Sequence, residues 1–157
     1  MNKITRNITV PISVDRAFHS FVDRLGEWWP AEYTWSQDQL QRIAIEGREG
    51  GLCSEVGPYG FRCDWGRVTA FETDRKISFT WQISPQRVPE PDPSRASNVN
   101  VSFNGEGAAT SITFEHTNFE KHGEGAKQYQ EAMASDRGWD YILEQYKAYC
   151  ERSALRR

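Results

Sequence analysis

The sequence contains no apolar run of about 18 residues or more, which is the length that a membrane-spanning helix needs. It also begins without a leader that joins positive charge to an apolar stretch. We therefore expect a cytoplasmic chain that neither spans a membrane nor is exported.

Cysteine is scarce, and its spacing excludes several kinds of site. Cys53, Cys63 and Cys150 are an odd set without the short spacing of metal ligands, so we expect reduced thiols, as in cytoplasmic proteins. Cys53 and Cys63 flank a turn and are expected to face each other across adjacent strands as small buried residues. Neither a metal nor a cofactor is expected.

The sequence also lacks a concentration of charge of one sign. Its 157 residues carry a net charge of −3, with a pI near 5.7, and the basic residues are scattered. This distribution argues against nucleic acid or a membrane surface as the main partner. The length predicts a single domain over residues 1–157, large enough to bury a core without disulfide or metal support.

Aromatic residues are abundant in the middle of the chain, at alternating positions that predict strands. A helix is expected after the first strand, and a single long amphipathic helix over about residues 125–155, with Gly138 inside it. This order predicts an α+β fold with helices packed on one face of an antiparallel sheet. The expected strands span residues 4–10, 41–46, 51–56, 61–72, 76–83, 97–104 and 110–118.

The segment over residues 85–94 contains four of the seven prolines. Proline has no backbone N–H to donate to a strand ladder. We therefore expect a mobile connection here, and residues 86–96 to be among the least ordered parts of the chain.

Several short motifs occur in an order that resembles one known superfamily. They are Gly50-Gly51, Cys63-Asp64-Trp65-Gly66-Arg67-Val68, Phe79-Thr80-Trp81, Thr110-Ser111-Ile112-Thr113-Phe114-Glu115-His116 and Gly138-Trp139. The set resembles the SRPBCC, or START-like, superfamily, and within it the branch named after the activator of the heat-shock-chaperone ATPase.

The resemblance covers residues 4–148 and implies a helix-grip fold, in which a curved antiparallel sheet wraps a long C-terminal helix around a deep apolar cavity. The superfamily includes lipid and hormone binders, polyketide cyclases, oxygenase domains and co-chaperones, so the fold leaves the activity open. We expect that this chain lacks the chaperone-binding domain of the full activator, and that the name of the branch does not describe its function.

Two groups of side chains are candidates for a ligand site. The loop over residues 28–35 holds three tryptophans, which either line an opening or close the end of the sheet. His116 is expected on an inward face, either as the polar group of a cavity or as a buried, hydrogen-bonded histidine. The sequence shows no catalytic partner for it at a recognisable spacing, and no metal-binding cluster with His19 or His122. We expect an apolar pocket near this loop, with His116 at its wall. The candidate ligand-binding residues are Trp28, Trp29, Trp35, Tyr59, Phe79, Trp81, Phe103, Phe114, His116, Met133 and Trp139.

The leading hypothesis is a cytoplasmic small-molecule-binding module that holds an apolar or aromatic ligand between the sheet and the C-terminal helix, with His116 and Tyr59 setting its orientation. One alternative is a cyclase- or hydrolase-like enzyme that uses His116 as acid or base. A third is a co-chaperone-like protein-interaction module or a homodimer, which predicts an exposed apolar patch.

Overall fold

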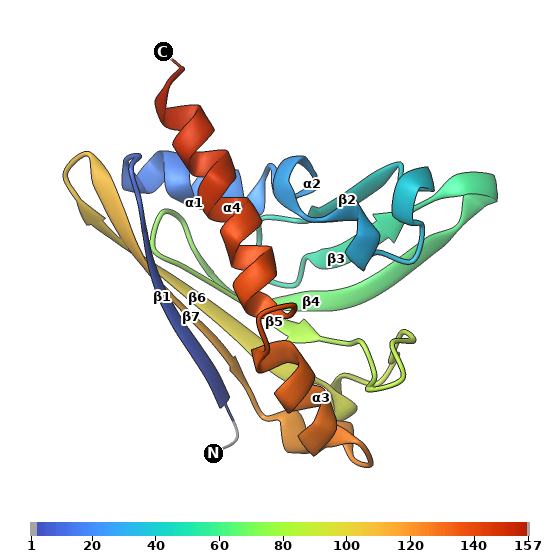
Figure 1. Ribbon diagram of the computed structural model, residues 1–157. Coiled ribbons are helices and arrows are strands. Elements are labelled where there is room, and N and C mark those ends of the chain that lie inside the picture. Colours follow the sequence, from blue (N-terminus) through green and yellow to red (C-terminus); the bar gives the residue numbers. More distant parts are fainter. Residues whose placement is uncertain (1–2, 157) are drawn as a thin grey trace.

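A seven-stranded antiparallel sheet is the framework of the computed structural model, which describes residues 3–156. The strand order is β1-β7-β6-β5-β4-β3-β2, and each neighbouring pair is antiparallel. Figure 1 shows a curved sheet with the last helix running across it. The strands are β1 (Lys3–Val10), β2 (Arg42–Ile45), β3 (Leu52–Val56), β4 (Arg62–Glu72), β5 (Lys76–Trp81), β6 (Ser97–Glu106) and β7 (Ala109–Thr117).

The helices lie between the first two strands and after the last one. Helix α1 contacts β6 and β7, α2 contacts β2, and α4 contacts β1, α1 and α2 (Figure 1). The predicted α+β helix-grip fold is therefore confirmed. The helices are α1 (Val14–Val22), α2 (Leu25–Trp28), α3 (Ala126–Ala134) and α4 (Trp139–Ala154), with 3-10 turns at Ala31–Tyr33, Gln37–Gln39, Pro58–Gly60, Pro93–Arg95 and Phe119–His122.

The alternation in the central strands predicts their register correctly. In β7 the side chains alternate between buried and half-buried, and the paired strand β6 continues the inward set. Because successive side chains of a strand point to opposite faces, a shift of one residue would have exposed these aromatic groups. Five aromatic residues of the candidate ligand-binding set are nearly fully buried: Phe79, Trp81, Phe103, Phe114 and Trp139.

The C-terminal segment forms two helices, which corrects the expectation of one continuous helix over residues 125–155. Helix α3 ends at Ala134 and α4 begins at Trp139. Between them Gly138 has a non-helical backbone, and a Cβ atom there would overlap the carbonyl oxygen of Met133. Only glycine fits this close approach, and the interruption lets the two helices take different directions over the sheet (Figure 1).

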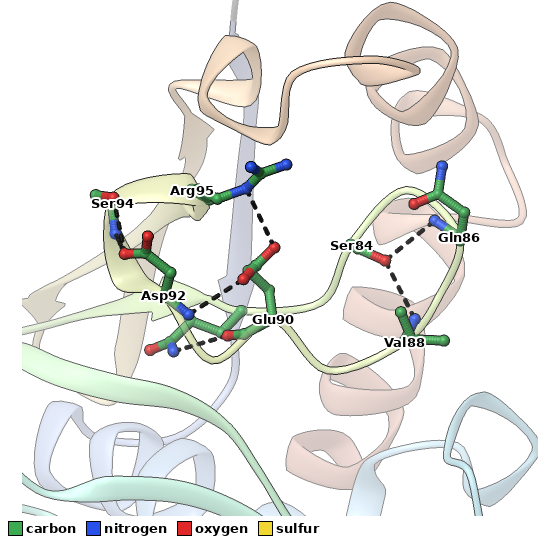
Figure 2. A network of polar contacts seen from close by, with 8 residues as sticks. Ser84, Gln86, Val88, Glu90, Asp92, Ser94 and Arg95 are labelled. Atoms are coloured by element: carbon green, nitrogen blue, oxygen red, sulfur yellow. Dashed lines mark hydrogen bonds and ion pairs between the residues drawn. The ribbon is translucent and has the colours of Figure 1, made fainter.

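The proline-rich segment forms no strand, as expected, and local hydrogen bonds, several of them from side chains, take the place of a ladder; its mobility stays a prediction. The Ser84 hydroxyl accepts from the backbone N–H groups of Gln86 and Val88 (Figure 2). The Glu90 N–H donates to the carbonyl of Gln82, whose amide nitrogen donates to the carbonyl of Glu90. The segment is thus a hydrogen-bonded turn structure that begins directly after β5.

The cysteines do not face each other as expected. Cys53 lies opposite Gly66, and Cys63 lies opposite Glu55, because a bulge interrupts the pairing of β3 with β4 after Cys53. All three cysteines are buried and free, and burial raises the pKa of Cys63 and Cys150 to about 11. Their thiols are therefore protonated at neutral pH.

Within residues 3–156, none of the helices has the length and apolar character needed to cross a membrane.

Candidate functional site

A pocket of about 550 Å³ lies where three segments of the chain meet. One side is the aromatic loop after α2, the second is the end of β5 with the turn that follows it, and the third is the α3–α4 pair. Its walls are mainly apolar and aromatic, which is typical of small-molecule sites. The principal wall residues are Trp29, Trp35, Trp81, Tyr129, Met133 and Ile142.

A buried carboxylate holds the aromatic loop in place. Glu55, on β3, is 1% exposed. Its carboxylate accepts hydrogen bonds from the backbone N–H groups of Trp35 and Ser36, at 3.2 and 2.8 Å, and from the Ser36 hydroxyl at 2.7 Å. Three donors on one carboxylate offset the cost of burying it and fix the loop relative to the sheet.

Two aromatic side chains of this loop bridge the mouth of the pocket. The Tyr33 hydroxyl donates to the carbonyl of Arg137, between α3 and α4, at 2.6 Å. The Trp35 indole N–H donates to the carbonyl of Arg87, in the turn after β5, at 2.8 Å. The three walls are therefore joined to one another by hydrogen bonds.

The inner wall is built around Tyr129 of α3. The Trp81 indole N–H donates to the Tyr129 hydroxyl at 2.7 Å, and that hydroxyl donates to the carbonyl of Ile83 at 2.9 Å. Burial raises the pKa of Tyr129 to about 12, so the phenol stays neutral. Trp29 stacks on Trp65 with ring centroids 6.1 Å apart, and its indole nitrogen is buried without a hydrogen-bond partner among residues 3–156.

His116 lies in the core and does not line the pocket. The Trp139 indole N–H lies 2.9 Å from its Nδ1, and its Nε2 lies 2.6 Å from the Ser97 hydroxyl oxygen. Since an indole nitrogen can only donate, Nδ1 is the acceptor and the ring proton is on Nε2. The Ser97 hydroxyl is also 2.7 Å from Nε2 of His122.

Both histidines of this group are kept neutral. Burial lowers the pKa of His116 well below its ordinary value, and it lowers the pKa of His122 as well. With both nitrogens of His116 engaged by protein groups, its ring has no free position for a ligand or for proton transfer. The ring does contact Trp81, with centroids 5.6 Å apart, and through it adjoins the inner wall.

The sequence-predicted site residues fall into three groups. Four of them line the pocket: Trp29, Trp35, Trp81 and Met133. Tyr59 is fully exposed, on the turn between β3 and β4, and is not part of the pocket. The others are buried in the core without lining the pocket: Trp28, Phe79, Phe103, Phe114, His116 and Trp139.

Several pocket residues were not predicted from the sequence. Tyr33 belongs to the aromatic loop, and Tyr129 is on the inward face of the last helical segment, so both carried a signal that could have been used. Arg87, Arg137 and Glu32 also line the pocket. Charged residues in loops are common, and nothing in their sequence pattern distinguishes these three.

Comparison with known proteins identifies the family. The family model described as Activator of Hsp90 ATPase homolog 1-like protein matches residues 11–151. No match is found among curated proteins.

Several solved structures are similar over nearly their whole length. One is the anthrahydroquino-gamma-pyrone synthase Txn09 in complex with SUM, with 25% identity and a TM-score of 0.68, covering 94% of this chain and 96% of that chain. Another is CalC, a self-sacrificing resistance protein from Micromonospora echinospora, with 20% identity, a TM-score of 0.70 and coverage of 99% and 98%. A third is the Aha1 dimer from Colwellia psychrerythraea, with 15% identity, a TM-score of 0.63 and coverage of 96% and 97%.

The last two likenesses, below 25% identity, show a shared fold alone. The family model covers most of the sequence, and the sheet order and helix arrangement agree with it. The chain therefore belongs to the family of Activator of Hsp90 ATPase homolog 1-like proteins.

Proposed function

We propose that this protein is a small-molecule-binding module that holds an apolar or aromatic ligand in the pocket between the sheet and the α3–α4 pair. The observation that carries the proposal is the pocket itself: its volume of about 550 Å³ lies within the range of roughly 300–1,000 Å³ that is usual for ligand sites. We also propose a cytoplasmic location, which the three free cysteines favour.

Burial of ligand surface would provide most of the binding free energy, at about 25 cal/mol per Å² of apolar area. The indole rings of Trp29, Trp35 and Trp81 offer flat apolar surfaces, which suit an aromatic ring system. Because hydrogen bonds already join the three walls, little of this free energy is spent on ordering the site.

The similarity to Txn09 supports the same conclusion. That chain is named a synthase of an anthrahydroquino-gamma-pyrone, which is an aromatic compound, and it was solved in complex with SUM. Because Txn09 is named a synthase, the same similarity also agrees with the enzyme alternative. In this chain, however, the proposed acid or base of that alternative, His116, is enclosed in the core with both of its nitrogens engaged.

The proposal is tested by titrating the purified protein with N-phenyl-1-naphthylamine, a neutral probe that fluoresces in apolar sites. We expect saturable binding that weakens about tenfold or more in Ala132→Trp, because Ala132 is an exposed α3 residue at the pocket and a bulky ring there occupies its volume. Trp35→Ala should also weaken binding, by removing a wall.

Tyr59→Ala is the matched control, since it removes an exposed aromatic side chain away from the pocket and should leave the affinity unchanged. Thermal unfolding of each variant establishes that it is folded. Absence of saturable binding, or an affinity that Ala132→Trp does not alter, would rule the pocket out as the ligand site.

A further inference from the structure

Two arginine side chains stand at the mouth of the pocket without a counter-ion. Arg87 follows β5, and Arg137 lies between α3 and α4; both line the pocket. Within residues 3–156 neither guanidinium group forms an ion pair, whereas Arg6 and Arg62 each lie beside a carboxylate. Unpaired cations beside an apolar pocket favour an anionic ligand group.

The position of Arg87 is fixed by three separate contacts. Its carbonyl accepts the indole N–H of Trp35, its Nη1 donates to the carbonyl of Pro85, and its guanidinium carbon lies 4.4 Å from the ring centroid of Tyr129. Stacking on an aromatic ring leaves the edge of the guanidinium group free to donate further hydrogen bonds. Arg87 is therefore oriented before any ligand binds.

The backbone at Arg87 is also unusual. Its φ of 65° is in the left-handed region that favours glycine, and a residue with a side chain is strained there. The hydrogen-bonded turn that contains Arg87 keeps it in this conformation (Figure 2 shows the neighbouring bonds from Ser84 to Gln86 and Val88). Strained residues of this kind occur preferentially at functional sites.

Arg137 is held by the opposite bridge, and one carboxylate of the pocket is already engaged. The Tyr33 hydroxyl donates to the Arg137 carbonyl, and no hydrogen bond occupies the guanidinium group of Arg137 in the described part of the chain. Glu32 also lines the pocket, but its carboxylate accepts the hydroxyl of Tyr141, a bond that lowers the pKa of Glu32. The charged side chains that line the pocket are thus two cations and one carboxylate.

We propose that the ligand is an aromatic compound with an acidic group, such as a carboxylate, a sulfonate or an acidic phenol. Its ring system lies against the tryptophans, and its anionic group is bound at the mouth, chiefly by Arg87 and with Arg137 as the second cation. This inference rests on the proposed ligand-binding function and specifies the chemistry of the ligand.

Two fluorescent probes that differ by one charged group test it. 1-Anilinonaphthalene-8-sulfonate carries a sulfonate, whereas N-phenyl-1-naphthylamine has the same ring system without it. In Arg87→Met, which keeps an unbranched apolar side chain but removes the charge, we expect the dissociation constant of the sulfonate probe to rise about tenfold. The neutral probe should change by less than about twofold, and Arg137→Met should show the same pattern with a smaller effect.

Arg87→Lys retains the charge and should recover part of the affinity for the sulfonate probe. Arg75→Met is the matched control, because Arg75 is exposed on the turn between β4 and β5, beside Glu72 and away from the pocket. High salt should weaken binding of the sulfonate probe to the wild type and leave the neutral probe unaffected.

The outcomes separate the two proposals. If both probes bind but Arg87→Met leaves the sulfonate probe unchanged, or weakens both probes equally, the acidic-ligand inference is overturned and the binding function stands. If neither probe binds saturably, the binding function fails and the inference falls with it.

Discussion

Acidification below about pH 6.5 should destabilise this protein through His116 and His122. Both rings are buried around the Ser97 hydroxyl, and burial lowers the pKa of each. In the unfolded chain the same rings bind a proton at about pH 6.5. Between that value and the lower folded-state pKa values, the unfolded state therefore binds more protons than the folded state.

The size of the effect follows from this difference in bound protons. Each histidine that is charged only when unfolded lowers the free energy of unfolding by about 1.4 kcal/mol per pH unit. Together the two histidines give a slope of at most about 2.7 kcal/mol per pH unit, in the pH range below about 6.5 where both are protonated only in the unfolded chain. His19 contributes a weak slope of the opposite sign. Its exposed ring is hydrogen-bonded to Asp23, and this bond raises the pKa of His19 in the folded state.

Urea unfolding followed by tryptophan fluorescence measures this slope between about pH 7.5 and pH 4.5. Most carboxylates titrate lower, near pH 4, so the upper part of this range reports mainly on the histidines. His122→Gln removes one of the two rings and should reduce the slope, whereas His19→Gln should make it slightly steeper.

A wild-type slope that His122→Gln does not reduce would refute this account of acid destabilisation. So would a free energy of unfolding that stays constant from about pH 6.5 to pH 5, since the folded protein would then bind as many protons as the unfolded chain.

Two further substitutions test the elements that shape the pocket. Gly138→Ala should lower the free energy of unfolding by several kcal/mol, because its Cβ would overlap a carbonyl oxygen of α3. Gly60→Ala is the comparison: Gly60 has open space around it and a φ of 77°, so the same change should cost only about 1–2 kcal/mol. Urea unfolding measures both. Glu55→Gln should lower the free energy of unfolding by about 1–3 kcal/mol, because an amide cannot accept every hydrogen bond that the carboxylate accepts. It should also weaken binding of N-phenyl-1-naphthylamine, because the loop at Trp35 is released. Exposed Glu106→Gln is the control, and an unchanged affinity in Glu55→Gln would contradict the prediction.

The strands could be predicted from the sequence because their signal is local. Alternating aromatic and aliphatic residues in β6 and β7 reflect burial of one face, and burial is the main source of stability. The same alternation in β5 marked it as a strand, although the structure buries both of its faces. The break between α3 and α4 could not be predicted in the same way. Apolar residues recur at spacings of three and four within each helix, and the junction was marked only by Asp136, Arg137 and Gly138, residue types that also occur inside continuous helices.

The pocket could be predicted only in part, for a similar reason. Trp29 and Trp35 were recognisable because large aromatic side chains are unusual in a loop. Arg87 and Arg137 are separated by 50 residues in the sequence, and both line the pocket, where their carbonyl groups accept hydrogen bonds from the Trp35 and Tyr33 side chains. Such tertiary contacts leave no periodic pattern from which they could be read.

His116 shows why a buried polar residue does not by itself locate a ligand. A buried imidazole must be hydrogen-bonded, and this requirement led to its selection as the polar point of a cavity. In the structure Ser97 and Trp139 meet the requirement, 19 and 23 residues away in the sequence. Once both nitrogens are engaged, the ring contributes to the stability of the core. The polar groups that remain available to a ligand are those with unused donors, and at this pocket they include the guanidinium groups of Arg87 and Arg137 and the indole N–H of Trp29. Substitutions at His116 should therefore alter mainly the unfolding of the protein, and those at the two arginines its choice of ligand.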